Sequence, residues 1–207
     1  SSGIRELPMF DELVKFFVVL LVVVEPLSLL PVLAGLTEGA DDAYRRRMSW
    51  KAVRLSAVVC LVFAVGGTAL LGLLGISVDA FKVGGGILLF LLAIEMVFAR
   101  PSGARSITPV EDAEAHHRVD ISVFPLAFPF IAGPGSLATI LLAFGAASKE
   151  PMLFAGLLTC VLIALVCVLL TLYMASPLMK LMGVTGANVV NRLFGVVLGA
   201  LAVQYVI

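Results

Sequence analysis

Six long stretches of hydrophobic residues alternate with short polar links along the chain. Each stretch holds about 20 residues, the length that an α-helix needs to cross the hydrocarbon core of a bilayer. The pattern therefore predicts an all-α integral membrane protein with six transmembrane helices, at residues 16–36, 53–74, 81–98, 122–147, 152–174 and 189–207.

The first stretch contains residues that interrupt a membrane helix near its centre. Glu25 places a carboxylate in an apolar run, and Pro26 and Pro31 each remove a backbone donor and crowd the carbonyl four residues earlier. Residues 133–137 of the fourth stretch match residues 25–29 at Pro, Ser and Leu. We therefore expect the first and fourth helices to be broken at Pro near the bilayer midplane.

Two matches at nearly the same spacing indicate an internal duplication. Pro134 follows Pro26 by 108 residues, and residues 195–204 resemble residues 86–95 with a spacing of 109. Because each half has an odd number of spans, the second half must enter the membrane from the opposite side. The sequence predicts one transmembrane domain, residues 1–207, with two inverted-topology three-helix repeats at 10–99 and 121–207 and a cytoplasmic linker at 100–120.

The distribution of Lys and Arg predicts the orientation, because cytoplasmic loops carry an excess of both. With the N-terminus outside, the cytoplasmic side holds Arg45, Arg46, Arg47, Lys51, Arg54, Arg100, Arg105, Arg118, Lys180 and Arg192. The other side then holds Arg5, Lys15, Lys82 and Lys149. We expect a multi-pass protein of the cell (inner) membrane with both termini on the periplasmic or outer side.

Composition supports a membrane protein and excludes several other classes. Hydrophobic residues make up 61% of the chain and charged residues 14%, against about 25% charged in a typical soluble domain. Net charge is zero and no basic face with aromatics is present, so we expect no nucleic-acid partner. Because the sequence lacks metal-ligand spacings and HExxH, we expect neither a metal or cofactor nor an enzyme.

A broken helix exposes backbone groups that an intact helix hides. The half-helices after Pro26 and Pro134 should leave amides at positive dipole ends, which suit a small carboxylate, while freed carbonyls suit an ammonium group. A single kink satisfied by neighbouring hydroxyls would be purely structural; the pair favours a substrate site. Its predicted residues are Pro26, Leu27, Ser28, Leu29, Pro31, Gly133, Pro134, Gly135, Ser136 and Leu137.

Four further polar residues are candidates for ion coupling or gating: Glu25, Glu95, Asn191 and Arg192. Glu25 is a candidate proton carrier or cation ligand, and capping of the second half-helix is a compatible alternative. For Glu95 we favour a structural pair with Arg100. Arg192 is either a snorkelling side chain or a partner for Glu95.

Several motifs together resemble the MarC family of six-span inner-membrane proteins. They are Glu25-Pro26-x-Ser28-x-x-Pro31, the basic run 45–47, and residues 85–90, 125–136, 191–195 and 202–204. The resemblance implies an inverted repeat, outward termini and, for characterised members, ion-driven transport of glycine, alanine and similar amino acids. Glu25 replaces the family's Asp, and Ser28-Leu29 replaces its Gly-Asn.

We therefore expect a secondary active transporter of small neutral amino acids that works by alternating access of the two repeats. For the coupling ion we favour H⁺ over Na⁺, because one buried carboxylate takes up a proton more readily than it builds a cation cage. The expected partners are a small amino acid and the lipid bilayer. The alternatives are an exporter of another small metabolite and a non-transporting membrane scaffold.

Overall fold

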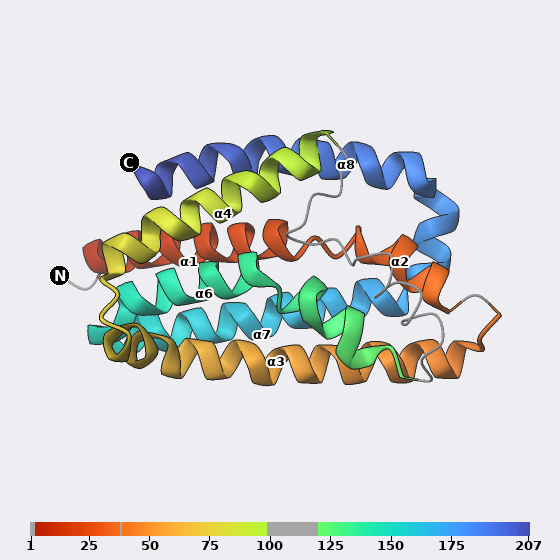
Figure 1. Cartoon of the computed structure of the whole chain (residues 1–207), viewed down its shortest axis with the longest axis horizontal. Helices are drawn as coiled ribbons and strands as arrows, with labels where there is room; N and C mark the ends of the chain where they lie inside the picture. Colours follow the sequence, from red (N-terminus) through yellow and green to blue (C-terminus); the bar gives the residue numbers. More distant parts are fainter. Residues whose placement is uncertain (1–2, 38, 99–119) are drawn as a thin grey trace.

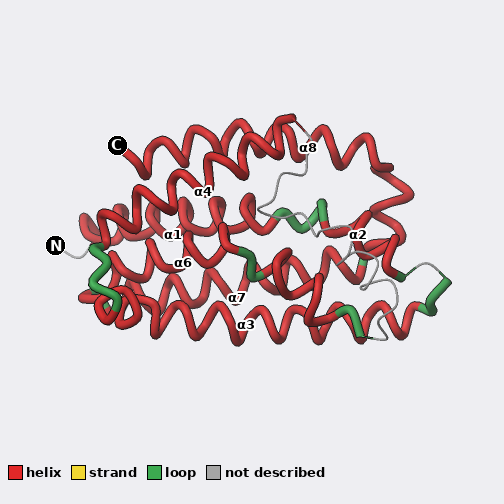
Figure 2. Tube along the Cα trace, viewed as in Figure 1, coloured by secondary structure: helices red, strands yellow, loops and turns green. Residues whose placement is uncertain are grey.

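The computed structural model describes residues 3–37, 39–98 and 120–207 and places nearly all of them in helices (Figure 2). No strand occurs among these residues, so the predicted all-α class is confirmed. The elements are α1 (Gly3–Val24), α2 (Leu29–Leu36), α3 (Asp42–Leu73), α4 (Val78–Phe98), η1 (Ser122–Ile131), α6 (Pro134–Ala146), η2 (Ala147–Lys149), α7 (Pro151–Tyr173) and α8 (Ala175–Val206).

The described helices include four segments that are long and apolar enough to cross a membrane. These are Met9–Leu36, Asp42–Leu73, Asp79–Phe98 and Pro151–Tyr173. The bent pair Ser122–Ile131 and Pro134–Lys149 makes a fifth if it counts as one span. The sixth predicted span falls in a shorter apolar segment, Asn188–Gln204, so the count of six remains a prediction.

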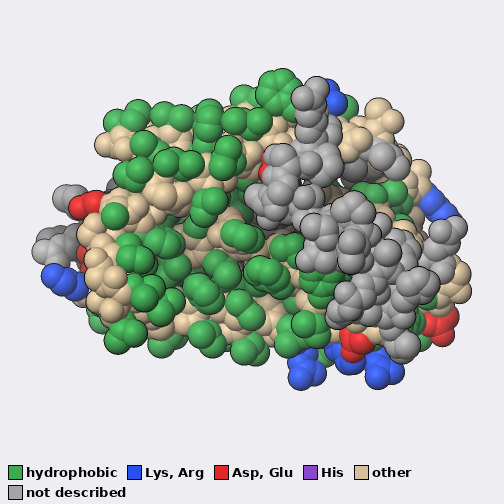
Figure 3. Space-filling model, viewed as in Figure 1, with side chains coloured by type: hydrophobic (Ala, Val, Ile, Leu, Met, Phe, Trp, Pro, Cys, Tyr) green, Lys and Arg blue, Asp and Glu red, His purple; other side chains and the backbone are tan. Residues whose placement is uncertain are grey.

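The face of the bundle that Figure 3 shows is largely apolar along the described helices, as expected for helices that contact lipid. On α3, Val58, Val62 and Val65 are 60%, 62% and 66% exposed, one turn apart along the helix. Soluble proteins rarely expose contiguous apolar surface of this kind. The pattern of exposure therefore agrees with a multi-pass membrane protein.

The helices lie roughly alongside one another in one bundle (Figure 1). α4 lies against α8, α3 packs on η1, α6 and α7, and α1 packs on α6 and α7. Figure 1 also shows the N- and C-termini at the same end of the bundle, while the loop between α2 and α3 lies at the other end. α1 and α3 therefore pack mainly on other helices and not on each other.

Small residues let two of the helices approach closely. A Cβ added to Gly195 of α8 would lie 2.7 Å from Met96 Cβ of α4 and 3.0 Å from the Val97 backbone nitrogen. Gly199, one turn later, lies near Ala93 with more room. The α4–α8 contact therefore depends on the absence of a side chain at Gly195.

Polar contacts determine where α3 begins. The Asp41 carboxylate accepts a hydrogen bond from the Tyr44 amide at 2.8 Å, which is a standard N-cap contact. Arg45, in the first turn of α3, reaches back to the C-terminal end of α2. The link between the two helices is thus held at both of its ends.

Candidate functional site

The first predicted break is present in the structure. α1 ends at Val24 and α2 begins at Leu29, with Glu25 and Pro26 between them. The Glu25 amide still donates to the Leu21 carbonyl at 3.0 Å, which continues α1, but the Glu25 backbone has a φ of +49°. Because Pro26 cannot donate a hydrogen bond and crowds the helix before it, the chain leaves the helical path here.

Glu25 combines two unfavourable features at this break. Its side chain is only 5% exposed, which removes a carboxylate from water. Its backbone lies in the left-handed region, which a residue with a Cβ adopts at a cost of roughly 1–3 kcal/mol. Such features persist when the surrounding structure imposes them, and they concentrate at functional sites.

The remainder of the first break differs in part from the prediction. The Ser28 amide donates to the Glu25 carbonyl at 3.0 Å, so a tight turn uses an amide that we expected to be available for a ligand. Pro26, Leu27 and Ser28 are half-buried, and Leu29 is fully buried.

Pro31 does not break the chain a second time. It lies at the third position of α2, where a backbone N–H would have no partner within the helix. The lack of a donor at Pro31 is therefore harmless there, and the expectation that both prolines interrupt the span is wrong for Pro31.

The second break lies between η1 and α6, whose axes meet at a bend of 54°. η1 is a π-helical segment in which Phe124 and Phe128, each followed by Pro, have extended backbone angles. Pro134 occupies the first position of α6, which its fixed φ suits. A Cβ at Gly133 would collide with the Pro129 carbonyl oxygen, so this corner requires glycine.

Ser136 is buried at the second break and forms a hydrogen bond across it. Its side chain is 1% exposed, and its hydroxyl donates to the Ile131 carbonyl at 2.9 Å. The Leu137 amide donates to the Gly133 carbonyl at 3.0 Å, which is the first hydrogen bond of α6. The Leu137 amide is therefore not available to a ligand, contrary to expectation, whereas the Gly135 and Ser136 amides precede that first bond.

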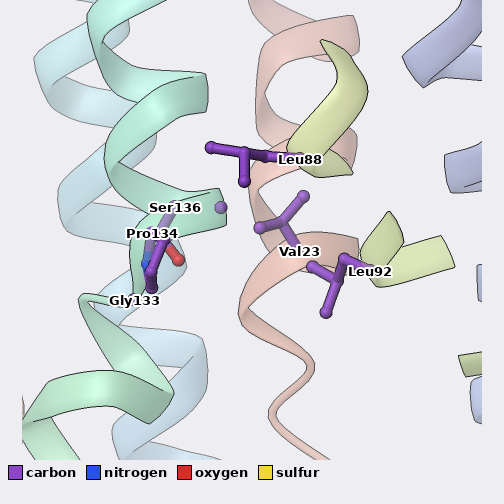
Figure 4. Close-up of a pocket in the computed structure, with 7 residues that line it drawn as sticks. Val23, Leu88, Leu92, Gly133, Pro134 and Ser136 are labelled. Carbon is purple, nitrogen blue, oxygen red and sulfur yellow. The ribbon is translucent and has the colours of Figure 1, made fainter. Parts of the chain in front are cut away.

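A small cavity adjoins this second break (Figure 4). The centre of a water molecule can occupy about 20 Å³ of this cavity. That volume has room for about one water and is too small for an amino acid. The backbone of residues 133–136 forms one wall. Val23 of α1 and Leu88 and Leu92 of α4 form the other (Figure 4).

Sequence reasoning did not identify the three apolar lining residues. Nothing distinguishes Val23, Leu88 or Leu92 from other apolar residues of their spans, because a helix that is hydrophobic all round has no patterned face. Among the described residues, the first helix reaches this cavity through Val23, two residues before Glu25. The two breaks are therefore neighbours through the end of α1, and the cavity belongs to the second break.

Gly135 allows the start of α6 to lie close to α1 and α4. A Cβ at Gly135 would lie 2.9 Å from Val23 Cγ1 and 3.3 Å from Leu92 Cδ2, closer than ordinary van der Waals contact. The start of α6 thus fits against α1 and α4 because Gly135 has no side chain. Gly135 therefore serves close helix packing as well as exposure of its backbone amide.

The other predicted polar residues lie on α4 and α8. Glu95 is 8% exposed on α4, and Arg192 is exposed on α8. In the described part of the chain no ion pair joins them. Asn191 lies in α8, but its side chain and Arg100 are outside the described residues. Across residues 3–37, 39–98 and 120–207, no three His, Cys, Asp or Glu side chains meet as a metal site would require.

Comparisons with known proteins agree with the resemblance noted from the motifs. The sequence pattern of the family described as "MarC family integral membrane protein" matches residues 10–207. The chain is 32% identical over 195 residues to "UPF0056 membrane protein YvbG" of Bacillus subtilis, covering 94% of this chain and 92% of that protein.

Two further relatives come from other lineages. "UPF0056 membrane protein MJ1677" of Methanocaldococcus jannaschii is 34% identical over 185 residues, covering 89% of each chain. "UPF0056 inner membrane protein YhgN" of Escherichia coli K12 is 29% identical over 194 residues, covering 94% of this chain and 93% of that protein. No solved structure matches the chain significantly.

Proposed function

The chain belongs to the MarC family of integral membrane proteins, and from this premise we propose that it is a secondary active transporter of small neutral amino acids of the glycine, alanine and serine class. Two broken helices, one carrying a buried carboxylate, support transport. The substrate class follows the resemblance of the motifs. Coupling is to H⁺ in preference to Na⁺, and the protein acts by alternating access.

The main support for transport comes from Glu25 at the first break, whose side chain is buried and whose backbone is left-handed. A membrane protein that used this kink only for packing would need neither the carboxylate nor the strained conformation. Intramembrane carboxylates in transporters bind coupling ions or relay protons. We therefore assign Glu25 the role of taking up the coupling proton.

We place the substrate site at the second break. The Gly135 and Ser136 amides lie at the positive end of α6 and are suited to a substrate carboxylate. Tight packing of Gly135 on Val23 and Leu92 leaves space only for a small side chain. Because the cavity has room for only about one water, the conformation described here is closed, and binding requires α6 to move away from α1 or α4.

The pattern of helix contacts supports the proposed inverted repeat. Exchanging α1–α2, α3 and α4 for η1–α6, α7 and α8 preserves the largest packing pairs, although the small α7–α8 and α6–α7 contacts have no counterpart of that size among the described residues of the first half. α3 packs on α6 as α7 packs on α1, and α4 packs on α6 as α8 packs on α1 and α2. α1 and α6 also run in opposite directions in Figure 1. This is the arrangement that rocking of one repeat against the other requires.

The distribution of charge supports the proposed orientation. Lys and Arg side chains gather along the first half of α3, towards the end of the bundle opposite the termini (Figure 3). By the positive-inside rule that end faces the cytoplasm, and the termini face outward. We propose the inner membrane as the location, in keeping with the name of the relative YhgN.

Ligand-dependent thermal stability of the purified protein tests the substrate assignment. A ligand that binds the folded state at 100 times its Kd stabilises that state by about 2.7 kcal/mol. We expect glycine, alanine and serine to raise the melting temperature, with leucine and aspartate as comparison ligands. Ser136→Ala should weaken the shift, because loss of the hydroxyl's bond to the Ile131 carbonyl loosens the corner that positions the Gly135 and Ser136 amides. Thr159→Ala should not, because it removes an exposed hydroxyl that makes the same type of bond to the Ala155 carbonyl.

Uptake into proteoliposomes under a pH gradient tests the coupling. We expect Glu25→Gln to retain the ligand-induced thermal shift while losing acceleration of uptake by the proton gradient. Proton-driven uptake that survives Glu25→Gln would contradict the role of Glu25. A protein that no amino acid stabilises at millimolar concentration, with Ser28→Ala and Ser136→Ala both silent, would instead support a non-transporting scaffold.

A further inference from the structure

A second, larger groove lies on α3 away from both breaks. It lies between the first half of α3 and the residues that lead into η1, and about 360 Å³ of it is open to the centre of a water molecule. Four residues of α3 line one side: Lys51, Arg54, Leu55 and Val58. Their spacing of three, four and seven residues places them on one helix face.

One end of the groove is polar. Lys51 Nζ lies 2.7 Å from Asp120 Oδ2, and Asp120 also accepts a hydrogen bond from the Ser122 amide at 3.0 Å. The Lys51 ammonium and the Ser122 bonds hold the pKa of Asp120 at about 2, well below its usual 3.8. Lys51 is therefore neutralised, while Arg54 beside it is exposed and adds a net positive charge.

The other end of the groove is apolar and open. Leu55, Val58 and Val123 are 38%, 60% and 57% exposed there. At 1.5 Å per residue, Lys51 and Val58 are about 10 Å apart along the axis of α3. A single groove thus changes from charged to apolar along a helix that crosses the membrane.

We propose that this groove binds an anionic glycerophospholipid, with its phosphate at Arg54 and an acyl chain along Leu55, Val58 and Val123. The charge of Arg54 complements a phosphate, which a guanidinium binds with two parallel hydrogen bonds. The apolar end matches a hydrocarbon chain and offers nothing to a soluble anion. Basic pockets between membrane helices bind anionic lipid head groups in this way.

The site is independent of the proposed transport function. Its residues are separate from Glu25, Gly135, Ser136 and the small cavity, so lipid binding and substrate binding can be measured apart. A lipid here would join α3 to the start of η1. It would stabilise the contact that positions the second broken helix, since α3 packs on both η1 and α6.

Lipid titration of the delipidated, detergent-purified protein tests the proposal. We expect phosphatidylglycerol to raise the melting temperature and to bind at least tenfold more tightly than phosphatidylcholine in native mass spectrometry. Arg54→Ala should abolish most of that preference. The matched control is Arg47→Ala, which removes another exposed charge of α3 that does not line the groove.

A second pair of variants tests the acyl-chain end. Val58→Gln should weaken phosphatidylglycerol binding several-fold, whereas Val62→Gln, at a position with nearly the same exposure outside the groove, should not. Stabilisation by inorganic phosphate alone would overturn the lipid assignment in favour of a soluble anion. Equal losses for Arg54→Ala and Arg47→Ala would overturn the site and indicate attraction by diffuse charge.

Discussion

The Arg45 guanidinium holds the C-terminal end of α2 through two bonds to Thr37. Nε donates to Thr37 Oγ1 at 3.0 Å, and Nη2 donates to the Thr37 carbonyl at 3.3 Å. Thr37 is the C-cap of α2 and is 1% exposed, and Nη1 of Arg45 also lies 3.4 Å from Ser176 Oγ at the start of α8. One side chain of α3 thus joins the half-helix after Glu25 to the last helix of the chain.

Arg45→Ala should destabilise the protein by about 1–3 kcal/mol, because hydrogen bonds from a charged group are lost and a buried carbonyl and hydroxyl lose a donor. Arg47→Ala, at an exposed position two residues later, should change stability by less than about 0.5 kcal/mol. Melting temperatures of the two purified variants measure the difference. Equal effects would mean that Arg45 acts through charge alone.

Glu25→Gly should separate the backbone role of Glu25 from its carboxylate. Glycine adopts a φ of +49° without strain, so the folded state should lose a penalty of about 1 kcal/mol. We expect Glu25→Gly to be more stable than Glu25→Ala in thermal unfolding. If Glu25→Ala were the more stable of the two, the left-handed conformation would not persist in the folded protein.

Gly135→Ala should destabilise the junction of α6 with α1 by about 1–3 kcal/mol, since the new Cβ would lie 2.9 Å from Val23 Cγ1. Val23→Ala removes that methyl group. The double variant should therefore recover part of the loss, which a double-mutant cycle of melting temperatures would report as a coupling of about 1 kcal/mol. Strictly additive effects would show that the two residues do not touch.

Gly195→Ala should separate α4 from α8, because the new Cβ would approach Met96 Cβ to 2.7 Å and a backbone nitrogen of α4 to 3.0 Å. Neither neighbour is the flexible end of a side chain. Gly199→Ala, on the same helix, meets Ala93 Cβ at 3.6 Å and should be tolerated. We expect a clear loss of melting temperature for the first variant and almost none for the second. Similar melting temperatures for both would argue against this packing.

The Lys51–Asp120 ion pair should persist to unusually low pH. The folded state lowers the pKa of Asp120 from 3.8 to about 2, so its stabilising contribution is complete above pH 4 and is lost as pH falls through about 2. Solvent screening keeps it below about 1 kcal/mol, because the side chain is 44% exposed. The difference in melting temperature between wild type and Asp120→Asn should be constant from pH 7 to 5 and shrink below pH 4. Shrinkage already between pH 7 and 5 would contradict the shift.

Local chemistry explains which parts of the site the sequence could predict. A proline has no amide hydrogen and cannot continue the hydrogen bonding of a helix interior, so Pro26 and Pro134 in the middle of long apolar runs predict breaks, and both breaks occur where they were predicted. The expectation for Pro31 was wrong because the same missing donor is harmless in the first turn of α2. Whether Pro31 falls in the first turn depends on the residue at which the helix restarts after the break.

Availability of hydrogen-bonding groups could not be predicted in the same way. The Ser28 and Leu137 amides and the Ser136 hydroxyl are used by the Glu25, Gly133 and Ile131 carbonyls respectively. These pairings depend on the path of the chain through each break. A motif names the polar groups present, but only their positions in space decide which of them a ligand can reach.

The sequence by itself determined the helical class, the membrane-spanning character, the family and the two broken helices. The helical class and the membrane-spanning character follow from composition and from the length of the apolar runs, and the two breaks follow from the covalent structure of proline. The family follows from the resemblance of the motifs, with which the family match over residues 10–207 agrees. Only the tertiary structure decided the left-handed conformation of Glu25, the contact of Gly135 with Val23, and the cavity beside Leu88 and Leu92. The physical reason is that a membrane helix is apolar on every face, so its sequence carries no record of which face meets its neighbour.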